Sequence, residues 1–244
     1  MKSHRKETMG NLFKKAFTYK ETQCTIISDK ETAIKTAIES LKRNRKQLEK
    51  YLSANPKFLY TLKPVPVPQK PLVAKLMAEA AEKTNVGPMA AVAGVLADLA
   101  VNDMVRDGCE VAVVEDGGEV SAVSNLPIDV ALAAGDEPLS KRFGFRLTDF
   151  PVGLATSSGR FSHALSFGDA EAATVFCKDA GLADAAATAV GNVVKGEDYQ
   201  AAIEHGLNVA KSIVGVEGVL IIYKGLVGTW GKIPLIIKVD PSSS

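Results

Sequence analysis

The stretch Gly181–Asn192, GLADAAATAVGN, is built almost entirely from small residues and predicts a helix that its neighbours can approach closely. Its polar side chains, Asp184, Thr188 and Asn192, are spaced four residues apart and therefore fall on one stripe of that helix. Carboxylate, hydroxyl and amide oxygens are the donors that Mg²⁺ and Ca²⁺ prefer. Two interpretations stay open on these residues alone. The stripe binds a metal, or Asp184 caps the start of the helix, Thr188 bonds to a carbonyl and Asn192 ends it.

The 244 residues, 46% hydrophobic and 23% charged, are enough to bury a large core. Twenty-nine basic and 28 acidic residues give a net charge of +1, so the whole-chain charge predicts no nucleic-acid and no membrane partner. Three scattered cysteines without a C-x-x-C pair argue against a zinc site and favour a reducing compartment. No apolar run is expected to span a bilayer and no secretory signal is visible, so the expected location is cytoplasmic.

Hydrophobic periodicity and turn residues divide the chain into strands and helices. Strands are predicted at 17–28, 110–114, 119–123, 128–133, 145–148, 152–156, 162–167, 172–177, 219–223, 226–229 and 234–239. Helices are predicted at 30–55, 72–83, 89–106, 181–192 and 198–214. This order lacks regular β-α-β alternation, so we expect an α+β fold in which Ala- and Gly-rich helices pack on a mostly antiparallel sheet.

A single domain is predicted over residues 17–240. The basic stretch 1–16 is expected to be disordered, and 241–244 is expected to be a frayed tail. The prolines at 64, 66, 68 and 71 forbid a helix over 62–71 and predict an extended connector that runs over the surface of this domain.

Outside the helix, the candidates for chemistry are glycines, hydroxyls and one histidine. The sequence Asp116-Gly117-Gly118 predicts a hairpin turn, and its glycines would also let a ligand approach the backbone. Thr156–Gly159 is either a phosphate or metal loop or an ordinary loop. His163 either relays a proton or holds a phosphate, or it is a half-buried histidine of a strand. General nucleotide-binding and hydrolase motifs are missing from the sequence, so none of them names a reaction.

The order of three motifs resembles the ApbE superfamily, the flavin transferases once tied to thiamine biosynthesis. The matching segments are Gly117-Gly118-Glu119, then Thr156–Gly159 followed by His163, then Ala183–Thr188. Together with NVGPMAAVAG at Asn85–Gly94, these motifs look like a compact, uncharacterised ApbE-like family of bacteria and archaea. The resemblance extends over about residues 17–194.

This resemblance implies a Mg²⁺ ion held by Asp184 and Thr188, with His163 near the transferred phosphate. It also implies FAD or FMN near the residues Gly117, Gly118, Glu119, Thr156, Ser157, Ser158 and Gly159. The implied activity is Mg²⁺-dependent transfer or cleavage at a phosphoanhydride of a flavin nucleotide or another phosphorylated ligand, as in FAD:protein FMN transferases.

Two departures from the flavin transferases leave an alternative open. Ala93 stands where those enzymes carry a lysine before the helix glycine, and Ala164–Gly168 replaces their D-P-x-T-G run. The alternative is a non-catalytic binding protein for a flavin or another small phosphorylated ligand. The Ala- and Gly-rich helices also allow a homo-oligomer in which they form the interface.

Overall fold

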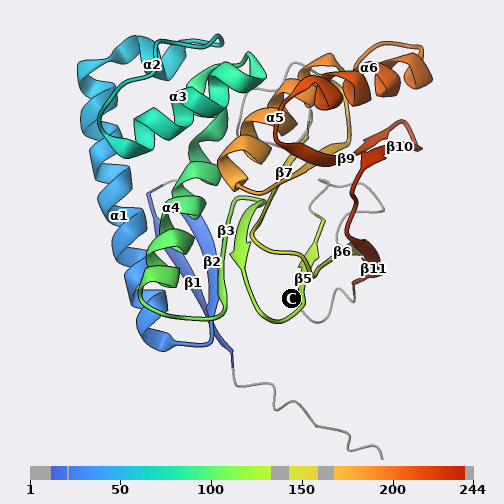
Figure 1. The fold of residues 1–244 in the computed structure, drawn as a ribbon. Coiled ribbons are helices and arrows are strands. Elements are labelled where there is room, and N and C mark those ends of the chain that lie inside the picture. The colour runs from blue at the N-terminus through green and yellow to red at the C-terminus, as the bar shows by residue number, and fades with distance from the viewer. Residues whose placement is uncertain (1–11, 21, 133–142, 159–167, 240–244) are drawn as a thin grey trace, which may run out of the picture.

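The computed structural model describes residues 12–20, 22–132, 143–158 and 168–239, and it confirms the α+β prediction (Figure 1). Within these residues, the large sheet has eight strands in the order β1-β2-β3-β4-β7-β8-β9-β10, and each strand pairs antiparallel with its neighbours. Its strands are β1 (Phe13–Tyr19), β2 (Thr22–Ser28), β3 (Ala112–Asp116), β4 (Glu119–Val123), β7 (Val152–Ser157), β8 (Ala172–Cys177), β9 (Val216–Tyr223) and β10 (Leu226–Gly231).

A small sheet and a set of helices cover the two faces of the large sheet. The small sheet has the order β11-β6-β5 and consists of β5 (Ile128–Ala131), β6 (Phe143–Leu147) and β11 (Leu235–Lys238). The helices are α1 (Glu31–Ala54), α2 (Pro56–Tyr60), α3 (Leu72–Thr84), the 3₁₀ turn η1 (Pro88–Ala91), α4 (Val92–Arg106), α5 (Ala180–Val193) and α6 (Tyr199–Ser212).

Each face of the large sheet has its own apolar core, as expected when successive side chains of a strand alternate between faces. On β7, Ala155 belongs to the core beneath the helices, and its neighbour Leu154 belongs to the core shared with the small sheet. Phe145 of β6 and Phe176 of β8 meet edge to face in this second core, with ring centroids 5.0 Å apart. This assignment of faces decides below which side chains reach the helices.

The structure corrects some of the predicted elements. The single strand expected at 17–28 is the hairpin of β1 and β2, because Lys20 adopts a left-handed conformation with φ 55° and turns the chain. The helix expected at 89–106 begins as the turn η1, and the short helix α2 was not predicted. The connector over 62–71 has neither helix nor strand, as predicted, and its Val65 and Val67 pack on the core. The strand expected at 162–167 lies outside the described residues.

The segment Pro88–Arg106 contradicts the expectation that no apolar run could span a bilayer. Its 19 residues include an 18-residue window with a mean hydropathy of 1.4, which would allow it to cross a membrane by length and composition. In this fold 56% of its apolar window is buried inside the protein, where α4 packs against α1 and α5. We therefore interpret α4 as the central core helix.

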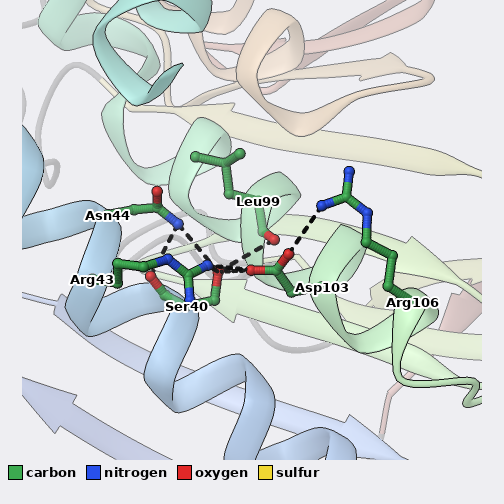
Figure 2. Close-up of polar contacts among 6 residues, drawn as sticks. All are labelled: Ser40, Arg43, Asn44, Leu99, Asp103 and Arg106. Carbon is green, nitrogen blue, oxygen red and sulfur yellow. Dashed lines mark hydrogen bonds and ion pairs between the residues drawn. The ribbon is translucent and has the colours of Figure 1, made fainter. Parts of the chain in front are cut away.

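A polar cluster fixes α4 against α1 (Figure 2). The hydroxyl of Ser40 donates to the Asp103 carboxylate at 2.6 Å and accepts a hydrogen bond from Asn44 Nδ2 at 3.1 Å. The Arg43 guanidinium pairs with the same carboxylate, and Arg106 reaches its second oxygen at 3.3 Å. Ser40 and Asn44 are buried, so these bonds satisfy polar groups that would otherwise be costly in the core.

Helices α4 and α5 cross at a glycine contact. A Cβ added at Gly94 would lie 2.2 Å from the Ala180 carbonyl oxygen, and one added at Gly181 would lie 2.5 Å from a methyl group of Val95. The small-residue composition of GLADAAATAVGN is therefore used for close helix packing, as the sequence predicted.

We expect Gly94→Ala to destabilise the protein by about 1–3 kcal/mol, because the backbone of Ala180 cannot move aside for a methyl group. Gly206→Ala in α6 is the matched control. Its new Cβ would meet no backbone atom, but it would lie 2.6 Å from a Val194 methyl group and 2.7 Å from an Ile221 methyl group. Side chains can shift more easily than backbone and alanine favours a helix, so a smaller loss than for Gly94→Ala is expected. Urea unfolding of both variants measures the difference, and equal losses would contradict the prediction.

Candidate functional site

The polar stripe predicted on α5 is present. The other residues from Ala180 to Gly191 are buried, whereas Asp184, Thr188 and Asn192 are partly exposed. Capping at the start of α5 is done by Asp179, whose carboxylate accepts the Leu182 N–H at 2.9 Å. The interpretation in which Asp184 caps the start of this helix is therefore wrong, because Asp184 lies more than a turn inside α5.

Asp184 instead caps the neighbouring helix. Its Oδ2 accepts the backbone N–H of Gly94 at 3.0 Å, in the first turn of α4, where helix N–H groups lack partners of their own. Asp98 of α4 does the same for α5, because its carboxylate accepts the N–H groups of Ala180 at 2.9 Å and Gly181 at 2.8 Å. The two helices thus exchange caps, and the exchange fixes the position of the α5 stripe.

Asp98 also joins these helices to the large sheet. Its Oδ1 accepts a hydrogen bond from the hydroxyl of Ser121 on β4 at 2.7 Å. Since side chains two residues apart on a strand share a face, Glu119 of the same strand also faces the helices. Asp98 therefore links α5, which carries Asp184 and Thr188, to the strand that carries Glu119.

Glu119 and Asp184 form the electrostatic centre of the candidate site. Burial raises the pKa of both carboxyls above their usual range, and the neighbouring Asp184 charge raises the pKa of Glu119 further. The Asp116 carboxyl adds to both shifts. Two neighbouring carboxylates repel each other, so a cation bound between them would be stabilised.

The segment Thr156–Ser158 lies at the same end of the sheet as Thr188 of α5. On β7, Gly153 lies directly under the start of α5, since its Cβ would be 2.2 Å from the Ala180 nitrogen. The bond from Asp169 N–H to the Val194 carbonyl shows that α5 runs back along β8, in the direction of β7. Ser157 is about 13 Å along β7 and Thr188 is about 12 Å along α5 from that common point, so they lie at a similar height.

The three described members of this segment differ in where they point. Thr156 bonds to Thr174 with 2.9 Å between the hydroxyl oxygens, on the face toward the small sheet and away from α5. Ser157 follows Ala155 on the helix face. Ser158 is 6% exposed, and its Oγ is the one buried side-chain oxygen or nitrogen without a hydrogen-bond partner in the described part of the chain. An unpartnered buried hydroxyl is uncommon and suggests a group that is supplied by a ligand.

The glycine pair forms the turn between β3 and β4. Gly117 and Gly118 have φ of 71° and 114°, so the hairpin itself requires glycine at this point. The Gly118 N–H bonds to Glu115 Oε1 at 3.1 Å, and no atom lies within 4 Å of its Cβ position. The turn explains both glycines, and it also leaves open space beside Gly118 for a ligand.

Two predicted site residues, Gly159 and His163, lie outside the described residues. Among the residues that are described, no group of three or more His, Cys, Asp or Glu side chains is arranged to hold a metal ion. The oxygen donors of the candidate site are therefore two carboxylates and the Thr188 hydroxyl, with Asn192 one turn further along the stripe.

Two acidic residues beside the site were missed by the sequence analysis. Burial raises the pKa of Asp98 and that of Asp116 to about 6. Asp116 is buried and accepts a hydrogen bond from the thiol of Cys24 on the adjacent strand β2. The available signal for Asp98 was a carboxylate inside the apolar run 89–101, four residues after Gly94.

Comparison with known proteins agrees with this architecture. A family model described as "AbpE bacteria" matches residues 7–225. This chain belongs to that family. It is 38% identical to a UPF0280 protein of Methanococcus vannielii over 94% of either chain, and 38% identical to one of Methanosarcina acetivorans over 96% of this chain and 93% of the relative.

Solved ApbE structures share the fold of this ApbE-family protein. The apo flavinyl transferase ApbE of Pseudomonas stutzeri superposes with a TM-score of 0.59 at 14% identity, over 90% of this chain and 94% of that one. The ApbE protein of Thermotoga maritima gives 0.58 at 14% identity, over 96% and 98%. The resemblance inferred from the motifs is confirmed, and at this identity the structural likeness concerns the fold.

We expect Asp98→Asn to become more stable relative to the natural protein as pH rises from about 4 to about 6. A folded-state pKa of about 6, above the ordinary 3.8, means that Asp98 loses its favourable protonated form over this window. The asparagine does not titrate, so the difference in unfolding free energy should grow by roughly 1–3 kcal/mol.

Urea unfolding at a series of pH values measures this difference. Asp149→Asn is the control, because pairing with Lys232 lowers the pKa of Asp149. The stability that Asp149 contributes therefore changes with pH only below about 3.8. Above that pH its curve should run parallel to that of the natural protein. A parallel curve for Asp98→Asn as well would contradict the prediction.

Proposed function

We propose that this protein is a Mg²⁺-dependent enzyme that cleaves or transfers at the phosphoanhydride of a flavin nucleotide. The observation that carries the proposal is the pair of Asp184 and Glu119, two partly buried carboxyls whose pKa values are raised at one end of the sheet. Family membership supports it, since the ApbE protein of Pseudomonas stutzeri, which shares this fold, is named a flavinyl transferase.

The residues present fit a magnesium ion. Mg²⁺ takes oxygen ligands and is usually held by one or two carboxylates, with the rest of its shell supplied by water and substrate phosphates. The Asp184 carboxylate, which accepts the Gly94 N–H through Oδ2 and also a backbone hydrogen bond from Ala93, would supply one ligand, and Thr188 lies one turn further on the same stripe. A divalent cation there would also offset the repulsion between the Asp184 and Glu119 charges.

When bound, the ion would neutralise charge that develops on the phosphate oxygens. The chain supplies the remaining functions. Asp184 is held in place by its bond to Gly94, and Glu119 is held by the β-ladder. The Ser158 hydroxyl, buried and unpartnered, is proposed to bond to the nucleotide, and the open turn at Gly117 and Gly118 to approach it. His163 is proposed to lie near the transferred phosphate.

The second candidate is a cytoplasmic binding protein for a flavin or another small phosphorylated metabolite. It is favoured by Ala93, which occupies the first turn of α4 where flavin transferases carry a lysine, so a positive charge is missing beside Asp184. A protein of this kind would keep the ligand through the same oxygen donors without turnover.

Incubation of purified protein with FAD and FMN, with and without Mg²⁺, distinguishes the two functions. The enzyme should release AMP from FAD when Mg²⁺ is present, and Asp184→Asn should abolish the release while it keeps an acceptor for the Gly94 N–H. Thr188→Val removes the hydroxyl at constant shape and should weaken Mg²⁺ binding at least about tenfold, whereas Thr188→Ser should retain it.

Tight flavin binding without AMP release would favour the binding protein over the enzyme. If the protein retains neither flavin and calorimetry detects no Mg²⁺ binding, the proposed site is wrong. Far-UV circular dichroism and unfolding of Asp184→Asn show whether loss of activity comes from loss of the α4 cap.

A further inference from the structure

Helix α2 and the turn that follows it form an apolar tip, Lys57–Lys63. Leu59, Tyr60 and Leu62 within it are 38%, 76% and 53% exposed, which is high for large apolar side chains that follow one another so closely. Figure 1 shows α2 at the outer end of the molecule, across the view from β11. The tip is therefore an exposed surface at the edge of the molecule.

The tip is held rigidly. Phe58 points inward, is 3% exposed and meets the Tyr51 ring edge to face at 5.1 Å. The Thr61 carbonyl packs against Gly87, where a Cβ would lie only 2.0 Å from its oxygen. The Thr61 hydroxyl accepts the Lys63 N–H at 3.2 Å. Little conformational entropy would be lost when this surface binds a partner.

The segment of the chain that carries the tip is basic. Residues 50–78 contain five lysines and no aspartate or glutamate. Lys57, Lys63 and Lys70 are exposed, and no ion pair joins them to a carboxylate in the described part of the chain. Glu49, which precedes this segment, is already paired with Lys20 and Arg45. The net charge of +1 for the whole chain conceals this local excess.

We propose that the tip Lys57–Lys63 docks on an anionic lipid bilayer. Tyrosine and leucine side chains partition into the membrane interface, and lysines beside them bind anionic headgroups while their aliphatic stems lie along apolar surface. Lysine is depleted in protein–protein interfaces, so an exposed tip of this composition favours lipid over an acidic protein. This proposal replaces the expectation of no membrane partner, which rested on net charge.

Docking would orient the candidate site. Gly87, which the tip contacts, is the N-cap of η1, and η1 continues into α4, whose first turn Asp184 caps. The end of the molecule where α4 begins would therefore face the bilayer. The docking proposal does not depend on the proposed flavin chemistry, and it is tested without any nucleotide.

Sedimentation with sucrose-loaded vesicles tests the proposal on the full chain. We expect binding to vesicles of phosphatidylcholine and phosphatidylglycerol at roughly 70:30 and much weaker binding to phosphatidylcholine alone. Tyr60→Ser combined with Leu62→Ser, and separately Lys57→Gln combined with Lys63→Gln, should each lower the vesicle-binding constant by roughly tenfold. Leu235→Ser with Ile236→Ser is the matched control, because these side chains are 64% and 51% exposed on β11. It should bind like the natural protein.

A fluorescence variant gives an independent readout. Trp230→Phe with Tyr60→Trp leaves the tip tryptophan as the single one in the chain, since the sequence has one tryptophan. Its emission should shift to the blue with anionic vesicles and be quenched by brominated lipid. The proposal is overturned if the natural protein does not sediment with anionic vesicles, if the tip and β11 variants bind alike, or if the tip tryptophan stays unquenched. Binding to poly-L-glutamate in place of vesicles would likewise overturn it and indicate an acidic protein partner.

Discussion

Two carboxylates hold the centre of this protein together by exchanging helix caps. Asp184 of α5 accepts an N–H group from the first turn of α4, and Asp98 of α4 accepts two from the first turn of α5. Unpartnered N–H groups at a helix start carry partial positive charge, so a carboxylate from the adjacent helix stabilises each of them. The exchange works only because Gly94 and Gly181 let the backbones come close enough.

This arrangement places charge where a core would ordinarily exclude it. Asp98 and Asp184 of the helices, and Asp116 and Glu119 on the face of the sheet that the helices cover, all have raised pKa values, caused mainly by burial. Such groups disfavour the folded state at neutral pH unless something compensates them. Asp98 is compensated by three hydrogen bonds and Asp184 by the α4 cap, whereas Glu119 has mainly its own backbone N–H, so its environment is the most suited to a bound cation.

The proposed docking surface lies apart from the apolar core. Helix α4 is apolar enough to cross a membrane, yet it is the buried centre against which α1, α5 and the sheet pack. The residues that we propose to meet a membrane are instead the exposed ones of the tip Lys57–Lys63, where lysines occur without acidic neighbours. Overall hydropathy and net charge are averages, and both conceal where apolar and basic side chains are exposed.

The sequence by itself determined the α+β class, turns such as Asp116–Glu119, and the polar stripe of α5. These features follow from backbone periods of 3.6 and 2 residues and from glycines in a turn, which act over a few neighbouring residues. The motif order also indicated the ApbE relationship and grouped Glu119, Asp184 and Thr188 in one candidate site.

Only the tertiary structure decided which helix Asp184 caps, that Thr156 points away from α5, and that Asp98 links both helices to β4. Asp184 and Gly94 are 90 residues apart in sequence, and Asp98 lies 82 residues from Ala180. Local periodicity predicts that a strand has two faces, but the face that meets the helices depends on the layer that packs on each side. Contacts between distant segments fix that choice, because burial and capping are properties of the assembled core.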